Sequence, residues 1–234
     1  MQLFYSTEID NQACILSPEE SRHCISVLRH VKGDTVNVFG NDGYLYTAQI
    51  TDNNPKKCIL TIIDKMPIAK RNGYLHIVIA PTKNMDRLEW FVEKAVEIGI
   101  EEITPIICDH SERKVLKIER LEKIIVSAMK QSQNLIFPKL NNPVECSKFL
   151  EQHFDAKKCI AYCEEKSLLY TDVIKGEKAV LTLIGPEGDF SKQEINTALA
   201  NGFTPVSLGE SRLRTETAGV VSSVFFSGQL TVDN

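Results

Sequence analysis

Two loops of this sequence place glycines and charged side chains directly after an apolar run, and such loops can bind a ligand. The first is IGPEGDFSKQE at residues 184–194, where Glu187 and Asp189 flank Gly188. Gly188 would let the backbone approach a ligand closely, and a carboxylate can act as a general base. A phosphate at this loop would meet two negative charges, so a neutral or cationic ligand fits better. A tight turn whose acidic residues only favour the next helix explains the loop equally well.

The second loop lies within SLGESRLRTETAGVVSS, residues 207–223, and repeats the order of strand, glycine, polar loop and helix. Arg212 and Arg214 stand among glutamates, so a surface salt-bridge cluster is the simplest explanation for the two cations. However, two such loops after consecutive strands of a parallel sheet would lie at the same edge of that sheet. We therefore expect the two loops to share a pocket.

The helix that is expected to begin at Thr215 has small residues along one side. Residues at this spacing share a helix face, and small side chains let a second helix approach closely, either in the core or across a subunit interface. We expect this side to support a homodimer. The small residues are Ala218, Gly219, Ser222 and Ser223.

Residues 1–70 are expected to form a β-rich domain with one helix. Ser17 and Glu20 have the spacing of a capping box, with Pro18 at the first helical position. Turn signals separate apolar runs of strand length. The predicted strands are 36–39, 44–50 and 58–63.

Residues 73–234 are expected to form an α/β domain. Apolar runs of strand length alternate with helix-period segments at 87–98, 118–133 and 193–200, the last capped by Ser191 and Glu194. This alternation predicts a mostly parallel sheet that is covered on both faces. The predicted strands are 75–80, 103–108, 159–162, 180–184 and 205–208.

Composition and charge narrow the class of protein. The chain has 234 residues, of which 43% are hydrophobic and 25% charged, as in ordinary globular domains. The formal net charge of −4 gives no bulk attraction to nucleic acid, so RNA contacts must come from a local patch. No segment approaches the roughly 20 apolar residues of a membrane span, and the first residues lack a signal-peptide pattern. We expect a cytoplasmic protein without a membrane partner.

The cysteines and histidines show no spacing that is typical of metal ligands. The seven cysteines include no CxxC pair, and the five histidines form no HExxH motif. Cys159 and Cys163 are the closest pair, but no second pair or nearby histidine completes a zinc set. The sequence therefore predicts that the protein holds no metal.

Taken together, IGPEGDFSKQE and LGESRLRTETA resemble the two signature loops of the RsmE family, SPOUT-class methyltransferases that act on uridine N3 of 16S ribosomal RNA. SRHCISVLRHVKGD resembles the N-terminal helix and turn of that family, and KNMDRLEWFVEKAVEIGIEEITP resembles its first long helix. The resemblance covers essentially the whole chain. Three segments depart from it: Asp189 stands where a second glycine is usual, Ser211-Arg212 replaces Arg-Ile, and KQSQN replaces an EQSxR run, which places Lys130 and Asn134 where the family has Glu and Arg.

The resemblance implies a small PUA-like β-barrel domain followed by a SPOUT-type, trefoil-knotted α/β domain with a parallel sheet. It also implies a homodimer that binds S-adenosylmethionine and acts on 16S ribosomal RNA or the small ribosomal subunit. S-adenosylmethionine has a positive sulfonium and no phosphate, so acidic residues near its site are tolerated. By resemblance, the cofactor-binding residues are Leu183, Gly185, Glu187, Gly188, Leu208, Gly209, Leu213, Arg214 and Thr215.

Two residues are candidates for catalysis. Arg214 would place a fixed cation near the uracil and favour the deprotonated imide. Glu187 would act as the general base, with helix capping or ribose binding as its other possible roles. The cofactor loops alone leave open another SPOUT activity, such as methylation of the ribose 2′-hydroxyl or of another base, and a non-catalytic RNA-binding or assembly protein.

A basic stripe in the first domain is the candidate RNA-binding surface. Arg22 and Arg29, like His23 and His30, are spaced by about two helical turns, and Lys32 follows closely. On one helix these side chains would share a face, which a solvated charged surface also explains. The resemblance favours RNA, and contacts with phosphates are the expected use.

Overall fold

The computed structural model describes residues 2–10, 12–162 and 167–230. The chain divides into two compact units. The first unit contains Met1–Lys70 and Val126–Phe137, and the second contains Arg71–Ile125 and Pro138–Asn234. The predicted domain boundary at residues 70–73 stays a prediction, because compactness does not test whether each part folds by itself. Residues 126–137, which were expected in the second domain, lie with the first unit.

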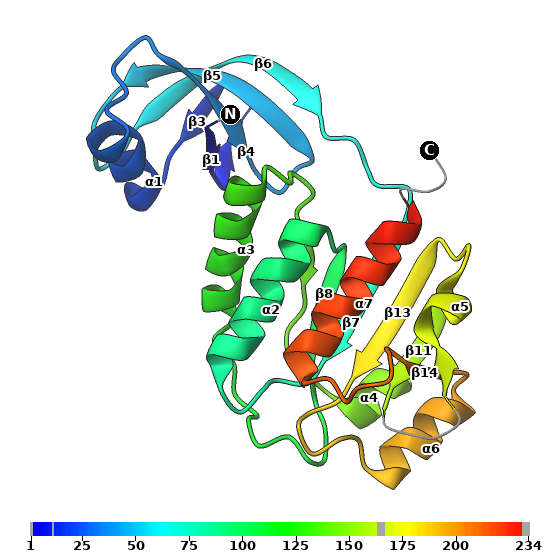
Figure 1. Cartoon of the computed structure of the whole chain (residues 1–234). Helices are drawn as coiled ribbons and strands as arrows, with labels where there is room; N and C mark the ends of the chain where they lie inside the picture. The colour runs from blue at the N-terminus through cyan, green and yellow to red at the C-terminus, as the bar shows by residue number, and fades with distance from the viewer. Residues whose placement is uncertain (1, 11, 163–166, 231–234) are drawn as a thin grey trace. The chain divides into compact units, whose positions relative to one another are not determined.

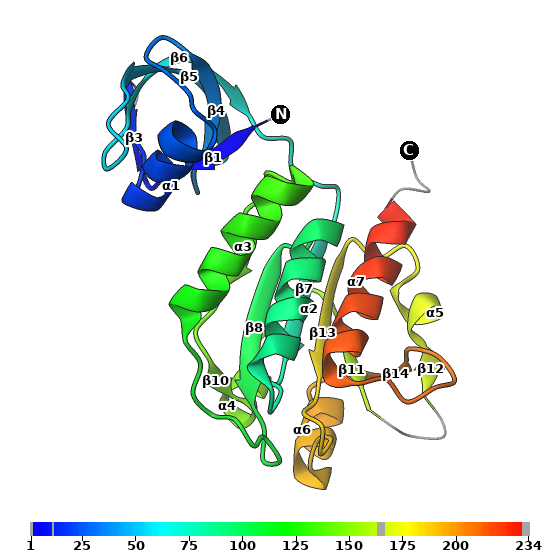
Figure 2. The same cartoon turned by 60° about the vertical axis from the view of Figure 1, so that its left-hand side comes forward.

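A six-stranded sheet forms most of the first unit, and it curls around a buried face (Figure 2). Its strands are β1 (Leu3–Tyr5), β2 (Glu8–Ile9), β3 (Ala13–Ile15), β4 (Thr35–Phe39), β5 (Tyr44–Asp52) and β6 (Ile59–Pro67). They lie in the order β1-β4-β5-β6-β3-β2, with β1 parallel to β4 and the other neighbours antiparallel. The three predicted strands are confirmed as β4, β5 and β6. The other three were missed because segments of two or three residues carry no readable periodicity.

The N-terminal helix is shorter than the sequence suggested. Helix α1 (Pro18–Arg22) begins after Ser17, whose Oγ accepts a hydrogen bond from Glu20 N at 3.2 Å. The second half of the predicted capping box is absent, because the Glu20 carboxylate accepts from Tyr5 N at 3.2 Å and pairs with Lys130 Nζ at 2.6 Å. After α1 the backbone widens into a π-helical turn, η1 (His23–Val27). The helix therefore ends before residue 29.

The second unit is built on a parallel sheet of eight strands. These are β7 (Tyr74–Ile79), β8 (Glu102–Ile107), β9 (Lys139–Leu140), β10 (Val144–Glu145), β11 (Lys157–Ala161), β12 (Leu168–Leu169), β13 (Ala179–Ile184) and β14 (Thr204–Ser207). Seven lie in the order β10-β8-β7-β13-β11-β14-β12, and β9 pairs with β8. All recorded pairings in this unit are parallel, as the alternation of strands and helices predicted.

Helices cover both faces of this sheet, as Figure 1 shows for α2 and α7 on the near face. On that face Phe91 and Ile79 pack around Gly219 of α7, while Val78 and Ala80 turn to the other face and join a core with residues of α4 and α6. No described helix is long and apolar enough to cross a membrane. The helices with residues in this unit are α2 (Met85–Ile98), α3 (Ile118–Ser132), α4 (Cys146–Leu150), α5 (Tyr170–Ile174), α6 (Lys192–Ala200) and α7 (Thr215–Leu230).

The strand order decides which loops meet. β11 lies between β13 and β14, so the segments that follow β13 and β14 leave the same edge of the sheet on either side of the end of β11. In open parallel sheets, ligands bind outside the carboxyl ends of the strands, where the strand order changes direction. The two loops that the sequence singled out therefore lie at the edge where a ligand site is expected.

Candidate active site

The loop between β13 and α6 is held in place from its helical end. Ser191 Oγ accepts from Glu194 N at 3.3 Å, and Glu194 Oε2 accepts from Ser191 N at 2.8 Å, which confirms the predicted capping box. Glu194 is buried, with only 7% of its surface exposed. Two of the backbone N–H groups at the start of α6 are thereby satisfied, and the end of the loop is fixed.

Asp189 occupies a backbone conformation that explains its departure from the family pattern. Its φ is 63°, in the left-handed region that glycine adopts most easily. Asp189 N donates to Pro186 O at 2.9 Å, and the side chain turns back so that Oδ1 accepts from Phe190 N at 2.8 Å. Aspartate tolerates this conformation because its short side chain can hydrogen-bond to the nearby backbone. The loop therefore keeps its turn without a second glycine.

Gly188 packs against His110, which follows β8. A Cβ added at Gly188 would lie 3.0 Å from His110 Cβ, and His110 Nδ1 lies 3.0 Å from Gly188 O and 3.1 Å from Asp189 O. The missing side chain at Gly188 thus gives room to His110. The expected close approach of a ligand to Gly188 stays a prediction, and the contact with His110 is a sufficient structural reason for this glycine.

The second loop, residues 208–214, is tied to the first by a buried hydrogen bond. Gly209 has a φ of 140°, and Gly209 N donates to Ser207 Oγ at 3.3 Å, so the chain turns sharply after β14. Helix α7 begins at Thr215, as predicted, and Thr215 Oγ1 donates to Gly185 O at 2.9 Å. A side chain from one signature loop therefore satisfies a carbonyl of the other.

The two loops enclose adjoining hollows, which confirms that they share a pocket. One hollow of about 390 Å³ has residues of both loops in its wall, and a second of about 470 Å³ lies along the loop after β14. Their sizes fall in the usual range for small-molecule sites. Both are lined by Ala161, Tyr162, Arg212, Leu213 and Ala218.

Most of the predicted cofactor residues lie in the walls of these hollows. Leu183 instead lies in the hydrophobic core of β13, fully buried, and Gly188 is not in either wall. Ala161 and Tyr162 at the end of β11 were missed, because the sequence does not reveal that β11 lies between β13 and β14. The predicted residues in the walls are Gly185, Glu187, Leu208, Gly209, Leu213, Arg214 and Thr215.

In the part of the chain that the structure describes, Arg212 and Arg214 do not form the surface salt bridges that the sequence suggested. Glu216, the nearest acidic candidate in sequence, is buried and has Oε1 3.9 Å from Arg87 Nε. Among the described residues, no ion pair involves Arg212 or Arg214, and both side chains are exposed. Salt bridges to neighbouring glutamates therefore do not explain the two arginines.

Glu187 is exposed and lies in the wall of the smaller hollow. Its Oε1 accepts from Lys83 N at 3.0 Å, which connects the loop after β7 to the loop after β13. Helix α6 is capped by Ser191, so Glu187 does not cap it. The wall thus combines two arginines with the carboxylates of Glu187 and Asp189, a mixture that suits a ligand with both positive and negative groups.

The small-residue side of α7 is used within the chain. A Cβ at Gly219 would clash with the Phe91 ring of α2, and Ser222 and Ser223 have no exposed surface. The small residues therefore let α7 pack closely against α2 within one subunit. Of the two uses expected for these small residues, packing in the core is confirmed, and the homodimer stays a prediction.

The predicted RNA-binding stripe does not lie on one helix. Helix α1 ends at Arg22, and Arg29 has a φ of 62°, so the helical spacing does not apply to it. His30 is held by Asp34 Oδ2 at 3.1 Å and Gln2 Oε1 at 2.8 Å. Arg22, Arg29 and Lys32 are exposed, and His23 and His30 are partly buried. The shared helix face was wrong, and the role of these residues in RNA binding stays a prediction.

Two other departures from the family pattern have local partners in the first unit. Lys130 pairs with Glu20, as noted above, and its charge is thereby matched within the unit. Asn134 Oδ1 accepts from Ile136 N at 3.2 Å, in the turn that follows α3.

The chain matches two family models over most of its length. Residues 70–226 match the RNA methyltransferase domain, and residues 16–63 match the RNA methyltransferase PUA domain. The described first unit is therefore PUA-like, and the parallel sheet carries the methyltransferase domain.

Individual proteins agree with the family models. The chain is 31% identical over 230 residues to a ribosomal RNA small subunit methyltransferase E of Buchnera aphidicola, covering 94% of this chain and 90% of that protein. A crystal structure of a probable rRNA-methyltransferase from Porphyromonas gingivalis superposes with a TM-score of 0.92 at 37% identity, with all of both chains covered. A Legionella pneumophila protein, solved with the bound cofactor SAM, has a TM-score of 0.85 at 28% identity and covers 100% of this chain and 98% of its own. The protein belongs to the RNA methyltransferase family whose members include ribosomal RNA small subunit methyltransferase E.

Proposed function

We propose that this protein transfers the methyl group of S-adenosylmethionine to N3 of a specific uridine in the 16S ribosomal RNA of the small ribosomal subunit. The family membership supports a methyltransferase acting on ribosomal RNA. The observation that carries the proposal is the pocket between the two signature loops, into whose wall Arg214 is built without an ion pair among the described residues.

The donor set of this pocket fits S-adenosylmethionine, which supplies an activated methyl group on a cationic sulfonium when bound. Gly185 and Gly209 line the hollows, where the absence of a side chain would let adenine and ribose approach the backbone, and Leu208 and Leu213 offer apolar contact. Glu187 and Asp189 are compatible with the positive sulfonium, and Arg212 and Arg214 in the same wall are compatible with the carboxylate of S-adenosylmethionine. Leu183 and Gly188 would not contact the cofactor directly, since neither lies in the pocket wall, and would act by supporting the residues that do.

Arg214 and Glu187 are the residues that would act on the uridine. Glu187 would take the proton from N3, and the electron pair left on N3 would form the bond to the methyl carbon while the pair of the broken sulfur–carbon bond stays on sulfur. Arg214 stabilises the imide anion that develops as the proton leaves, through a fixed charge that needs no reorganisation. The reaction needs no metal, because the leaving group is a neutral thioether and the acceptor is a nitrogen.

We propose that the first unit binds the RNA and that the second unit forms the dimer. The first unit, with Arg22, His23, Arg29, His30 and Lys32, would contact phosphates of the RNA. The second unit would form the SPOUT trefoil knot and pair with a second copy, and the protein would work in the cytoplasm. Sedimentation velocity of the purified protein tests the dimer: an active monomer at working concentrations contradicts it.

Nucleoside mass spectrometry is the experiment that tests the reaction. Small-subunit RNA from cells lacking the protein should be missing one N3-methyluridine, and the purified protein with S-adenosylmethionine should restore it. The same RNA should stop reverse transcriptase at one position, because a methyl group on N3 blocks the base-pairing edge. A new methyl group on a ribose would instead identify a 2′-hydroxyl methyltransferase. No cofactor binding and no methylation would identify a non-catalytic RNA-binding protein.

A further inference from the structure

Two cysteines that lie far apart in the sequence face each other across neighbouring strands. β8 and β10 pair in parallel, with Val144 opposite Ile106 and Glu145 opposite Ile107. Extending this register by one residue places Cys146 opposite Cys108. Neighbouring strands lie about 4.8 Å apart, and opposed residues of a parallel pair project to the same face of a sheet. The two thiols are therefore brought together by strand pairing.

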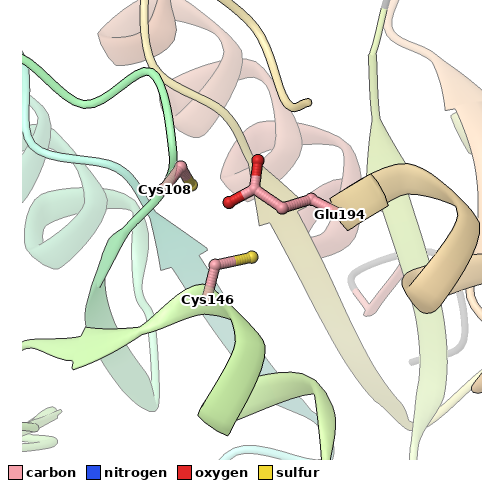
Figure 3. A group of neighbouring side chains, drawn as sticks. All are labelled: Cys108, Cys146 and Glu194. Atoms are coloured by element: carbon pink, nitrogen blue, oxygen red, sulfur yellow. The ribbon is translucent and has the colours of Figure 1, made fainter. Parts of the chain in front are cut away.

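A carboxylate from a third element completes the group. Glu194 of α6 points at the two thiols, and the sulfur and oxygen atoms converge on one spot (Figure 3). The three ligand atoms all lie within 4.8 Å of one another. All three residues are buried: Cys108 and Cys146 are each 2% exposed and Glu194 is 7% exposed.

The carboxylate is oriented by backbone groups. Glu194 Oε1 accepts from Asp109 N at 3.0 Å, and Oε2 accepts from Ser191 N at 2.8 Å. Each carboxylate oxygen has a further lone pair, so these bonds do not exhaust its capacity as a ligand. Hydrogen bonds that fix the orientation of a ligand in this way are typical of the outer shell of metal sites.

The group also has a route to solvent. A cavity of about 470 Å³ opens beside it, with Cys108, Cys146 and Glu194 in its wall. Asp109, Glu145 and Lys114 line the same cavity, and Glu145 Oε2 pairs with Lys148 Nζ at 2.7 Å, so charges of both signs lie around it. A cation could enter by this route, and the cavity leaves space for a water molecule as a further ligand.

We propose that Cys108, Cys146 and Glu194 bind a thiophilic divalent cation of the zinc class, with a water molecule from the cavity in the fourth position. Two thiolates and one carboxylate are a ligand set that zinc accepts in tetrahedral geometry, and thiolates disfavour magnesium and calcium. Binding releases one proton from each thiol to solvent, and no electron is transferred.

Deprotonation of the two thiols must accompany the binding of a cation. The hydrogen bond with the Cys146 thiol, together with burial, raises the pKa of the Cys108 thiol. A divalent cation between the sulfur atoms would supply the charge that makes both thiolates favourable. The prediction that the chain holds no metal stays untested, and this proposal differs from it because the prediction considered only ligands that are close in sequence.

The proposed metal site is separate from the methyl-transfer pocket, but both depend on the loop after β13. Glu194 holds Ser191 N, at the end of the loop after β13, and Ser191 Oγ donates to Asp109 Oδ2 at 2.6 Å. A bound cation would fix Glu194 and hence the base of that loop. The inference does not depend on the proposed reaction, because metal binding can be measured without RNA or S-adenosylmethionine.

Cadmium is a suitable probe, because its bonds to thiolate absorb in the ultraviolet. The full-length reduced protein, freed of metal with a chelator, should bind one Cd²⁺ per chain and develop this absorption, and zinc should compete. Cys108→Ser and Cys146→Ser should each lose the absorption and bind at least about tenfold more weakly, whereas Cys159→Ser, a buried cysteine of β11 outside the group, should behave like the wild type. Glu194→Gln should lower the affinity by at least about tenfold, since even the loss of a partner outside the ligand set costs roughly 10- to 100-fold.

Two further measurements keep the result clear. Thermal unfolding without metal shows whether each variant folds, and added Cd²⁺ should raise Tm of the wild type and of Cys159→Ser only. Cadmium NMR of the wild-type protein needs no variant and reports how many sulfur atoms bind the ion. A shift for two sulfur ligands supports the site. Failure to bind Cd²⁺, a shift for oxygen ligands alone, or equal binding by Cys108→Ser and Cys146→Ser overturns it.

Discussion

Thr215 Oγ1 donates a hydrogen bond to Gly185 O at 2.9 Å, and this buried contact joins the two loops that form the candidate active site. Thr215 is the first residue of α7, and Gly185 follows directly after β13. The hydrogen bond therefore connects two residues that are thirty positions apart in sequence and that both line the pocket.

Thr215→Val keeps the shape of the side chain and removes the donor, which leaves the buried Gly185 carbonyl without its partner. A buried acceptor left unpaired costs about 1–3 kcal/mol. We expect Tm to fall by a few degrees and the affinity for S-adenosylmethionine to fall roughly tenfold, since ~1.4 kcal/mol corresponds to a factor of ten. Calorimetry with the cofactor and thermal unfolding measure both effects. Thr217→Val, a substitution of the same kind on the same helix, is the control, and equal losses in both variants would contradict the role of the Thr215 hydrogen bond.

Arg214→Ala tests the chemical step. The charge on Arg214 is expected to act mainly on the anion that develops at N3, so the single-turnover rate should fall by about 10²–10³, as when one preorganised donor is removed from an active site. Cofactor affinity should change much less, the sign of an interaction made in the transition state. Arg214→Lys should restore only part of the rate, because an ammonium lacks the planar fork of guanidinium.

The matched comparison for this experiment is Arg212→Ala. Arg212 lies in the same pocket wall, so its replacement removes the same charge, but the family pattern assigns it no role.

The single-turnover rate of the wild-type protein should rise with pH until the imide or its base is deprotonated. Full turnover by Arg214→Ala would refute the mechanism.

Gly219→Ala tests the packing of α7 on α2. The added Cβ would meet the Phe91 ring and, at 3.2 Å, the Ile79 side chain, so either these side chains or the helix must shift. Overpacking of this kind costs about 1–3 kcal/mol. Gly228→Ala lies on the same helix, where the new Cβ would meet no described heavy atom within 4 Å, and should be neutral or stabilising by about 0.5–1 kcal/mol. Chemical denaturation of both variants measures the difference, and equal stability would show that α7 packs differently.

His76 predicts how stability depends on pH. Burial lowers the pKa of His76 to about 4, and this outweighs the nearby Glu102 carboxylate, whose Oε2 lies 3.9 Å from Nδ1. Since the folded pKa is below the unfolded value of about 6.5, the unfolded state binds more protons at acid pH. The contribution of neutral His76 is therefore complete above about pH 6.5 and is lost as the pH falls towards 4, on the order of 3 kcal/mol in total.

Unfolding with urea between pH 7.5 and 4 measures this slope. His76→Gln should reduce it, whatever its effect on stability at pH 7.5, because glutamine does not titrate. His153→Gln changes an exposed histidine of the same unit and should leave the slope unchanged. The same slope in the wild type and His76→Gln would mean that other groups determine the acid sensitivity.

The basic residues of the first unit predict a salt dependence for RNA binding. Replacing Arg22 and Arg29 by alanine should weaken binding and flatten the plot of log K against log salt by roughly 0.7–0.9 for each phosphate that the protein no longer neutralises. Lys56 and Lys57 are exposed in the same unit, and replacing both by alanine removes the same charge at another surface. A slope that changes equally in the two double variants would mean that the effect is general charge and not a site.

The local signals in the sequence determined most of the elements. The capping box of Ser191 and Glu194, the start of α7 at Thr215 and the long buried strands were all confirmed, because each depends on residues within a few positions of one another. The resemblance of the two loops indicated the family for the same reason, since each loop is a continuous segment. The prediction failed where a strand had only two or three residues and where the α-helix gave way to a π-helical turn. That turn follows Arg22, and Arg29 lies beyond it, outside the helix.

Only the tertiary structure decided which distant residues meet. The strand order puts the end of β11 between the two loops and so brings Ala161 and Tyr162 into the pocket. The register of β8 and β10 brings Cys108 to Cys146, although no spacing in the sequence suggests a pair. Strand order and register are set by the packing of the whole sheet and its covering helices, and this information is spread over the chain instead of being carried by any one segment.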